Sequence, residues 1–460
     1  MSSLVAGAPH WTDALGEPAR RWLDGRAVDE LECIVPDVAG TARGKAMTER
    51  KFAQLARQYL PVSIFYQTIT GEYVDLDWMP DQWTESDTVL VPDFATATAV
   101  PWSADVTLQV VHDVRRQDGE PVPFAPRNVL RRVIDEYARH GWRPIVAPEM
   151  EFYLTKPNTD PDYPIEPPVG RTGRQGIAQQ AYSMSAVEEY GPVIDVIYDY
   201  ADAQGFEIDT IIQESGAGQI EINLAHGDPL TLADQVFFHK RSIREAALAN
   251  GCFATFMAKP MQHQPGSAMH IHQSVVEIGT GRNVFNGEDD EPTALFQGFL
   301  SGQQTHLPAV VAILAPYVNS YRRFVADDAA PINLEWGVDN RTTGLRVPAS
   351  APESRRVENR VVGMDCNPYL AIAASLACGL LGMLSSARPR DPVPGNAYSL
   401  ARALPRDLLA ALDLFSRDDA ITALLGTEFC ALYRSIKRAE SEAFDRVISP
   451  WEREHLLLNV

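Results

Sequence analysis

The sequence predicts an α+β protein, in which strand-forming and helix-forming segments occupy different parts of the chain. The N-terminal quarter holds short apolar runs separated by turns rich in Pro, Asp and Gly, which is typical of strands. The middle of the chain holds four segments in which polar and apolar residues alternate, as in strands with one polar face. Residues 404–447 instead carry leucines at helical spacing, and this favours packed helices.

In the N-terminal part, strands are expected over Leu31–Val35, Thr88–Val91 and Val106–Val111. The segment 112–128 follows, with an Asp-Gly turn and three prolines, and such a segment favours a domain boundary. We therefore expect a first domain over residues 1–115 and a second over residues 116–460. A helix is predicted over Val129–His140, where apolar residues recur at helical spacing.

Composition excludes several classes of function. The chain has 61 acidic residues against 40 Lys and Arg, a net charge of −21, which argues against binding nucleic acid or anionic membranes through bulk charge. Its five cysteines form no CxxC pair, so we expect no disulfide framework and a reducing cytoplasm. The N-terminus lacks the pattern of a secretory signal. The longest apolar stretch, Ala371–Leu384, is interrupted by polar and glycine residues and falls short of the ~20 residues that span a bilayer.

The four alternating segments carry side chains of a catalytic type. Residues two apart on a strand share a face, and the shared faces hold Glu149 and Glu151; Gln219, Glu221 and Asn223, with Glu214 upstream; His270, His272 and Ser274; and Arg356, Glu358 and Arg360. One such segment alone is better explained by a solvated strand face. All four together contain mostly Glu, His and Arg and no lysine.

If these strands meet in one sheet, five carboxylates and an imidazole converge. Their mutual repulsion would raise their pKa values or unfold the site unless cations bind. Ligation mainly by oxygen favours Mg²⁺ or Mn²⁺ over zinc. Arginines beside such a cluster suit phosphoryl transfer, because they neutralise charge on the moving phosphoryl oxygens.

Six ordered motifs make the chain similar to a known family. They are PEMEFYL at 148–154, ESGAGQIEINL at 214–224, FMAKPMQHQPGSAMHIHQS at 256–274, NSYRRF at 319–324, NRTTGLRVP at 340–348 and RRVENRVVGMDCNPYLAIAA at 355–374. Over nearly its whole length the chain resembles the glutamine synthetase family, most closely the γ-glutamylpolyamine (γ-glutamylputrescine) synthetase branch. The resemblance implies an N-terminal β-grasp domain and a large catalytic domain, whose antiparallel strands form a metal-lined funnel. It also implies a dodecamer of two hexameric rings, with active sites between neighbouring subunits.

The resemblance also assigns roles to individual residues. It implies two or three Mg²⁺ or Mn²⁺ ions per site, one held by Glu151, Glu214 and Glu221 and another by Glu149, His270 and Glu358. From the residues alone, His270 is better explained as an ordinary hydrogen-bonded histidine, and the motif around it reverses this preference. For ATP the implied contacts are His272, Ser274, Arg341, Arg346 and Arg356, with Arg341 at the transferred phosphoryl group. For glutamate they are Gly266, Arg323 and Arg360. Each arginine, taken singly, also fits a surface salt bridge.

The implied reaction joins the γ-carboxylate of glutamate to an amine through a γ-glutamyl phosphate made from ATP, with Arg341, Glu151 and Glu214 as catalytic residues. Ammonia-using members carry a flap glutamate and an N-terminal aspartate. Here Ala329 stands at the flap position, and residues 64–69 contain no aspartate. We therefore expect a polyamine or monoamine as acceptor, in a pocket lined by Tyr66 or its neighbours. Asp327 and Asp328 either attract a distal ammonium of the acceptor or are solvated charges.

Three other functions compete with this interpretation. A glutamine synthetase using ammonia is disfavoured by the two missing acids. A non-catalytic structural member of the family would be expected to lose metal ligands, and all six are present. A two-metal hydrolase would share the carboxylates but has no use for so many phosphate-binding arginines.

Overall fold

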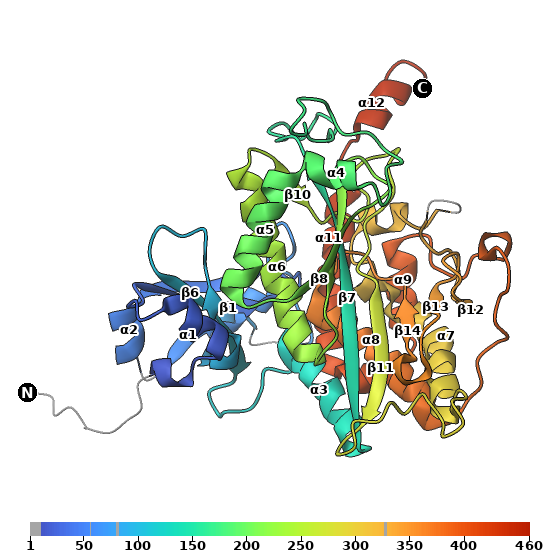
Figure 1. Ribbon diagram of the computed structural model, residues 1–460, viewed down its shortest axis with the longest axis horizontal. Coiled ribbons are helices and arrows are strands. Elements are labelled where there is room, and N and C mark those ends of the chain that lie inside the picture. The colour runs from blue at the N-terminus through green and yellow to red at the C-terminus, as the bar shows by residue number, and fades with distance from the viewer. Residues whose placement is uncertain (1–10, 56, 80–81, 326–328) are drawn as a thin grey trace, which may run out of the picture.

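The computed structural model describes residues 11–55, 57–79, 82–325 and 329–460 of the chain (Figure 1). The N-terminal sheet has the order β2-β1-β6-β4-β3, with β5 paired to β6. Its central strands β1 and β6 run parallel and the remaining pairs run antiparallel, which is the β-grasp arrangement expected from the resemblance. The strands are β1 (Glu30–Pro36), β2 (Ala42–Thr48), β3 (Gln58–Pro61), β4 (Asp87–Pro92), β5 (Thr98–Ala99) and β6 (Thr107–Arg115).

The second sheet positions the functional side chains. Its order is β12-β13-β14-β11-β7-β9-β8, with β10 paired to β7. The four polar segments of the sequence are the adjacent strands β14, β11, β7 and β9, so their predicted meeting in one sheet is confirmed. The strands are β7 (Trp142–Thr155), β8 (Ile208–Gln213), β9 (Gln219–Leu224), β10 (Phe253–Thr255), β11 (Ile271–Glu277), β12 (Trp336–Val338), β13 (Leu345–Val347) and β14 (Val357–Asn359). Figure 1 shows β7 and β11 side by side through the centre of the molecule.

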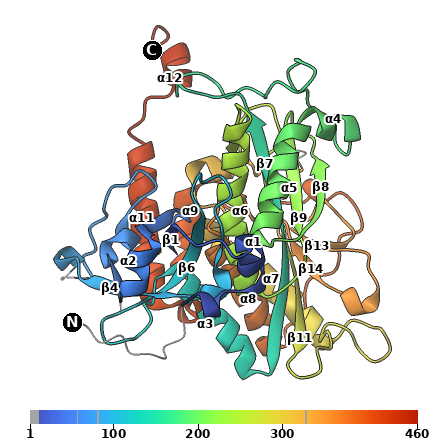
Figure 2. The ribbon, with the colours of Figure 1, turned by 60° about the vertical axis from the view of Figure 1, so that its left-hand side comes forward.

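Helices surround this sheet, and the predicted helical region near the C-terminus is confirmed as α9 to α11. The helices are α1 (Glu17–Leu23), α2 (Glu49–Gln54), α3 (Pro126–Arg139), α4 (Met184–Glu189), α5 (Gly191–Gln204), α6 (Pro229–Ala249), α7 (Ala294–Leu314), α8 (Pro368–Ser385), α9 (Leu408–Phe415), α10 (Asp419–Leu425), α11 (Thr427–Phe444) and α12 (Pro450–Leu456). In Figure 2 the blue N-terminal sheet lies beside the lower half of α11. The α12 helix projects from the body next to the loop after β7, and Arg453 Nη2 lies 3.3 Å from Asp162 Oδ1 there.

The proposed domain boundary at residues 115 and 116 falls where β6 ends. This strand extends four residues beyond Val111, because its pairing with β4 continues to Arg115. The two domains nevertheless share one core, in which Phe65 of the first packs with Phe124 at a ring-centroid distance of 5.7 Å. A separate small core, which includes Leu31, Cys33 and Leu108, lies under α1 and α2.

Among the described residues, one helix, α8, is long and apolar enough to cross a membrane. Within its most apolar window, 83% of the residues are buried inside the protein, as in the core helix of a globular fold. Gly379 and Gly382 explain why it packs so closely, since a Cβ at either position would lie within 2.1 Å of atoms of α7. The interruptions noted in the apolar stretch are therefore contact points between helices.

Candidate active site

The candidate site lies on one face of the four adjacent strands. In the pairing of β7 with β9, Glu149 stands opposite Asn223 and Glu151 opposite Glu221. On the other side of β7, the Glu149 N–H donates to His270 O at 2.9 Å, so the ladder continues one residue before β11 begins. The alternate residues of β7 and β9 are fully buried in the core on the opposite face (Met150, Phe152, Ile220 and Ile222). The apolar face therefore fixes the register that brings the polar side chains together.

Glu149 is the centre of this cluster. Its Oε2 lies 2.9 Å from His270 Nδ1 and its Oε1 lies 2.8 Å from His272 Nε2. Burial alone would raise the pKa of Glu149, but the hydrogen bonds to the two histidines lower it well below its usual value. Burial, helped by the charge of Arg360, lowers the pKa of His270 to about 4. His270 is therefore a neutral imidazole at pH 7, the form that binds metal ions.

Three further carboxyl groups have raised pKa values, because their ionised forms would be buried and would repel one another. Burial and the charge of Glu214 raise the pKa of Glu151 to about 8. Burial and the charges of Glu149 and Glu151 raise the pKa of Glu221 to about 9. Burial also raises the pKa of Glu214. These shifts are the electrostatic signature of an acidic pocket that gains stability when a cation enters.

Guanidinium groups border the cluster on the side of β13 and β14. Glu358, which is 1% exposed, accepts from Arg346 Nη1 at 2.7 Å and from Arg360 Nη1. Against the effect of burial, the charge of Arg360 lowers the pKa of Glu358 to about 2. Arg346 also donates to Asp339, and Arg356 Nε donates to His272 Nδ1 at 3.2 Å.

On the other side of the cluster, Gly266 packs against Arg323. A Cβ at Gly266 would lie 2.6 Å from Arg323 Cγ and 2.7 Å from Ala258 O, so only glycine fits. Arg323 is 2% exposed, and its two terminal nitrogens donate to Val361 O at 2.8 Å and Arg360 O at 2.7 Å. Arg323 thus braces the backbone that carries Arg360, whose own Nε has no partner among the described residues.

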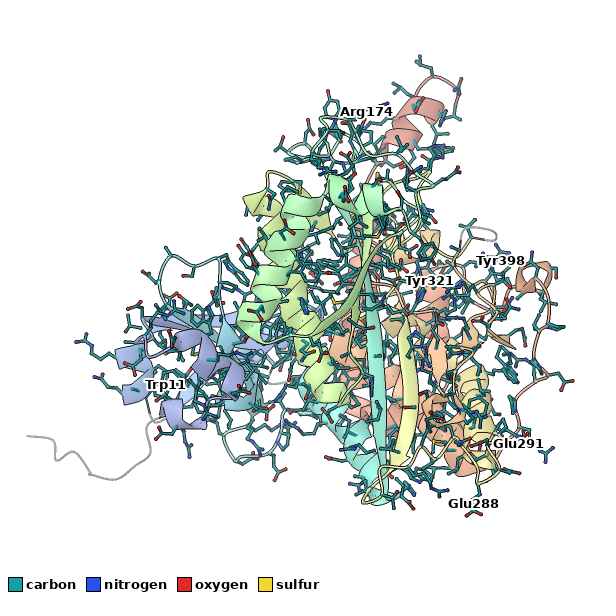
Figure 3. The ribbon with its side chains drawn as sticks, viewed as in Figure 1. Trp11, Arg174, Glu288, Glu291, Tyr321 and Tyr398 are labelled. Carbon is teal, nitrogen blue, oxygen red and sulfur yellow. The ribbon has the colours of Figure 1, made fainter. Side chains whose placement is uncertain are left out.

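A cavity of about 1390 Å³ opens beside the cluster. Glu149, His272, Ser274 and Arg356 form its inner wall, and the loop between β11 and α7 forms part of its outer wall. Glu288 of that loop, labelled in Figure 3, lies at the edge of the molecule. The cavity is large enough for a nucleotide, and its inner wall presents the imidazole and guanidinium groups that phosphate oxygens bind.

The donor set fits divalent metal ions. Among the described residues, two groups of side chains have ligand atoms within 4.8 Å of one another, namely Glu149, His272 and Glu358, and Glu149, Glu221 and His270. Four of the six predicted ligands are therefore gathered tightly. Glu151 adjoins them, with Oε1 3.9 Å from His270 Nδ1, and Glu214 acts on Glu151 and Glu221 through its charge. Both of these groups contain Glu149, and one contains His272. They therefore divide the ligands differently from the two sets of three that the family resemblance implies.

The remaining predicted residues lie as follows. Arg341 is exposed. Its charge partly offsets the burial that raises the pKa of Glu214, and it adds to the hydrogen bond from Arg346 that lowers the pKa of Asp339. Tyr66 is 1% exposed and donates to Met79 Sδ at 3.0 Å, so within one chain it belongs to the core and not to the cluster. Ala329 is exposed, with a φ of 60°. Asp327 and Asp328 lie outside the described residues.

Sequence reasoning missed three contributors to the site. Tyr153 continues the alternation of Glu149 and Glu151, and that spacing could have revealed it. Gln219 was recognised as polar but given no role, although it donates to Glu151. Asp339, which binds Arg346, comes from outside the four segments and left no pattern in the sequence.

Comparison with known proteins agrees with this geometry. The family model "Glutamine synthetase, catalytic domain" matches residues 123–456. The γ-glutamylputrescine synthetase PuuA of Escherichia coli (strain K12) is 33% identical over 434 residues, which cover 93% of this chain and 92% of that protein. The glutamate–isopropylamine ligase of a Pseudomonas species is 32% identical over 448 residues, which cover 94% of this chain and 96% of that protein.

A solved structure described as GmaS without ligand superposes with a TM-score of 0.81 at 27% identity, covering 96% of this chain and 99% of the other. Both the catalytic-domain match and the two relatives extend over most of the chain. The chain belongs to the glutamine synthetase family.

Proposed function

We propose that the protein is an ATP-dependent ligase that joins the γ-carboxylate of glutamate to a polyamine or monoamine through a γ-glutamyl phosphate. The observation that carries the proposal is the single polar face on which acidic, imidazole and guanidinium groups adjoin a nucleotide-sized cavity. Two relatives are named for ligation of glutamate to amines, putrescine in one case and isopropylamine in the other.

The chain's own residues would divide the work along the strands. In the cavity, His272, Ser274 and Arg356 would orient the ATP phosphates. Arg346, which donates to Glu358 of the cluster, would contact the phosphates from beside the cavity, and exposed Arg341 would meet the transferred phosphoryl group. Gly266 and Arg360 would hold glutamate, with Arg323 fixing the backbone of Arg360. Glu151, Glu214 and Glu221 would hold one divalent ion, and Glu149, His270 and Glu358 another. Two or three Mg²⁺ or Mn²⁺ ions would supply charge neutralisation at the phosphates and the substrate carboxylate.

The reaction would proceed in two balanced steps. An oxygen of the glutamate γ-carboxylate attacks the γ-phosphorus of ATP, ADP leaves, and γ-glutamyl phosphate forms. The nitrogen of the amine then attacks the acyl carbon, phosphate leaves with both electrons of the broken C–O bond, and the nitrogen loses a proton. Activation is required because oxide is too poor a leaving group for a carboxylate to react directly with an amine.

The acceptor site favours an amine larger than ammonia. Ala329 cannot supply the negative charge that would hold ammonium, and residues 64–69 lack an aspartate. Because Tyr66 is buried, its exposed neighbours Ile69 and Tyr73, 50% and 46% exposed, are the better candidates to line the pocket. A role for Asp327 and Asp328 in attracting a distal ammonium belongs to this proposal.

We further propose a cytoplasmic dodecamer of two hexameric rings, with each site completed by a neighbouring subunit. Of the described N-terminal residues proposed for the acceptor pocket, Tyr66 lies in the core, and neither it nor Ile69 nor Tyr73 lines the cavity beside the cluster of the same chain. The C-terminal segment also exposes a run of large apolar side chains, which marks a protein contact surface (Val447, Ile448, Trp451, Leu457 and Leu458). All five cysteines are free and buried, as expected in a reducing compartment.

The decisive experiment incubates the protein with ATP, Mg²⁺, glutamate and a mixture of biogenic amines, and identifies the product by mass spectrometry. We expect a γ-glutamyl amide of one amine, formed together with stoichiometric ADP. A Glu358→Gln variant serves as the inactive control, because Glu358 adjoins both the cluster and two arginines. Ammonia outcompeting putrescine, spermidine and simple monoamines at matched concentration would instead identify a glutamine synthetase. A protein that releases no ADP with any amine would be a non-catalytic family member.

A further inference from the structure

A buried glutamine connects parts of the site that are far apart in the sequence. Gln219 is 1% exposed, and its Nε2 donates to Glu151 Oε2 at 3.3 Å and to Gly266 O at 3.0 Å. Its Oε1 accepts from the N–H of Gly216 at 3.0 Å. One side-chain amide therefore contacts a carboxylate of the cluster, the loop around Gly266 and the turn that follows Glu214.

Tyr153 extends this connection from the same face of β7. Its hydroxyl lies 2.8 Å from Pro265 O and 3.2 Å from Gln219 Oε1, within hydrogen-bonding distance of both. Gly216 packs directly on this hydroxyl, since a Cβ there would lie 2.0 Å from it. The loop of residues 264–268 is also tied to the turn by Gln264 Oε1, which accepts from Ala217 N at 3.0 Å.

These contacts fix one oxygen of Glu151 and leave the other for a ligand. Oε2 accepts from Ala268 N at 2.8 Å as well as from Gln219. Oε1 faces His270 at 3.9 Å, which is beyond hydrogen-bonding distance. Both donors to Oε2 therefore come from the loop 264–268 or from the glutamine that holds it. A shift of the loop must move the partners of Glu151, and a shift of Glu151 must move the loop.

We infer that Gln219 is a positioning residue that couples the two binding events at this site. With a divalent ion bound beside it, the Glu151 carboxylate would hold Gln219 in place, and Gln219 would hold the backbone at Gly266. Glutamate would then bind to a loop that is already ordered. The inference rests on the proposed function, because it takes glutamate and a divalent ion as the ligands. Linkage requires the coupling to be reciprocal, so glutamate must tighten metal binding by the same factor.

The test measures coupling by titration calorimetry. L-glutamate is titrated into metal-free protein and into protein saturated with Mn²⁺, for the wild type and for Gln219→Leu, Gln219→Glu, Tyr153→Phe and Gln303→Leu. Gln303 is the matched control, since it is a fully buried glutamine that donates to Ser375 O between α7 and α8. Thermal unfolding of each variant identifies those that are folded, and Gln219→Glu replaces Gln219→Leu if the latter does not fold.

In the wild type we expect Mn²⁺ to tighten glutamate binding about fivefold or more. In both Gln219 variants, Mn²⁺ should leave the affinity for glutamate almost unchanged, so that the coupling factor is near one. Tyr153→Phe should weaken glutamate binding more than Mn²⁺ binding, because Tyr153 holds the loop directly and reaches Glu151 only through Gln219 and Ala268. Gln303→Leu should keep the wild-type factor.

The inference is overturned if a folded Gln219 variant keeps the wild-type coupling factor. It is also overturned if the wild type binds both ligands but Mn²⁺ does not change its affinity for glutamate. A purely structural glutamine would give the first of these results, lowering the unfolding temperature alone. Wild-type protein that binds Mn²⁺ but no glutamate would overturn the proposed function itself, a result distinct from the other two.

Discussion

At the scale of single residues, the close packing of Gly266 gives a direct prediction. Gly266→Ala places a methyl group against Arg323 Cγ and Ala258 O, at 2.6 and 2.7 Å. Such overpacking should destabilise the fold by about 1–3 kcal/mol. Displacement of the loop should also raise KM for glutamate by roughly tenfold or more. KM for ATP should change little, because the cavity proposed for the nucleotide is lined by residues within 143–149 of β7 and not by the loop of Gly266.

Initial rates against glutamate and against ATP, together with urea unfolding, measure these effects. Gly395→Ala is the matched control, since a Cβ at Gly395 has no neighbour within 4 Å. Equal increases in both KM values for Gly266→Ala would contradict a specific role of this loop in glutamate binding.

A second residue-scale prediction concerns His239 in α6. It is fully buried, neither ring nitrogen has a hydrogen-bond partner among the described residues, and burial lowers its pKa to about 4. The unfolded chain protonates this histidine near pH 6.5, but the folded chain does not until about pH 4. The unfolded state therefore binds more protons between these values, and stability falls as the pH falls.

His239→Phe should remove this dependence while keeping the ring contact with Phe206, whose centroid lies 4.9 Å away. The loss of unfolding free energy between pH 7 and 4 should be smaller by up to roughly 3 kcal/mol in the variant. Urea midpoints at the two pH values measure it, with the exposed His140→Phe as control. An unchanged pH dependence in His239→Phe would show that His239 does not contribute.

At the scale of secondary structure elements, the alternating pattern predicted the site strands well. A polar face against an apolar core is a local property, so β7 and β9 could be located from their own residues. Which strands lie next to each other in the sheet could not be predicted from local residues, because pairing between segments as distant as β11 and β14 depends on the whole fold. The burial of Tyr66 and the pairing of Arg346 with Asp339 escaped prediction for the same reason.

The paired strands β7 and β9 predict an unusual pH dependence in the metal-free protein. The pKa values of Glu151 and Glu221 are raised to about 8 and about 9, far above those in an unfolded chain. The folded state thus holds protons that the unfolded state has released, so this part of the stability is present below about pH 4.5 and is lost as the pH rises towards 9. Metal-free protein should therefore unfold at a lower temperature at pH 8 than at pH 6.

Glu221→Gln replaces one of these titrating carboxyl groups by a neutral amide, which needs no proton to stay uncharged. In the absence of metal the variant should be more stable than the wild type at pH 8, and Mn²⁺ should raise its unfolding temperature less. Thermal unfolding at the two pH values, with and without Mn²⁺, measures both effects. Glu442→Gln on the exposed face of α11 is the control. Wild-type stability that rises from pH 6 to 8 without metal would contradict the charge excess inferred for the cluster.

At the scale of the whole molecule, the N-terminal domain is fixed on the catalytic domain by contacts with α11. Glu440 Oε1 accepts from Ile69 N at 2.7 Å, and its Oε2 accepts from buried Lys437 at 2.8 Å. The turn that presents Ile69 and Tyr73 is therefore anchored to its own chain, and neither side chain lines the cavity beside its own cluster. In a closed ring, the same turn can serve the site of the next subunit.

Subunit mixing tests this arrangement. Glu358→Gln should inactivate the cluster of its own subunit, and Ile69→Arg should repel the amine from the site that its N-terminal domain completes. Each variant alone should be inactive in amide formation. In rings formed by co-expressing both in equal amounts, random neighbours should restore about a quarter of the sites, because a site then needs one intact half from each of two subunits. Rate per subunit, measured after the ring fraction is isolated by size, reports the recovery. If both variants are inactive alone and the mixed rings also stay inactive, each site is built from a single chain. If the Ile69→Arg variant is active on its own, Ile69 does not line the acceptor pocket.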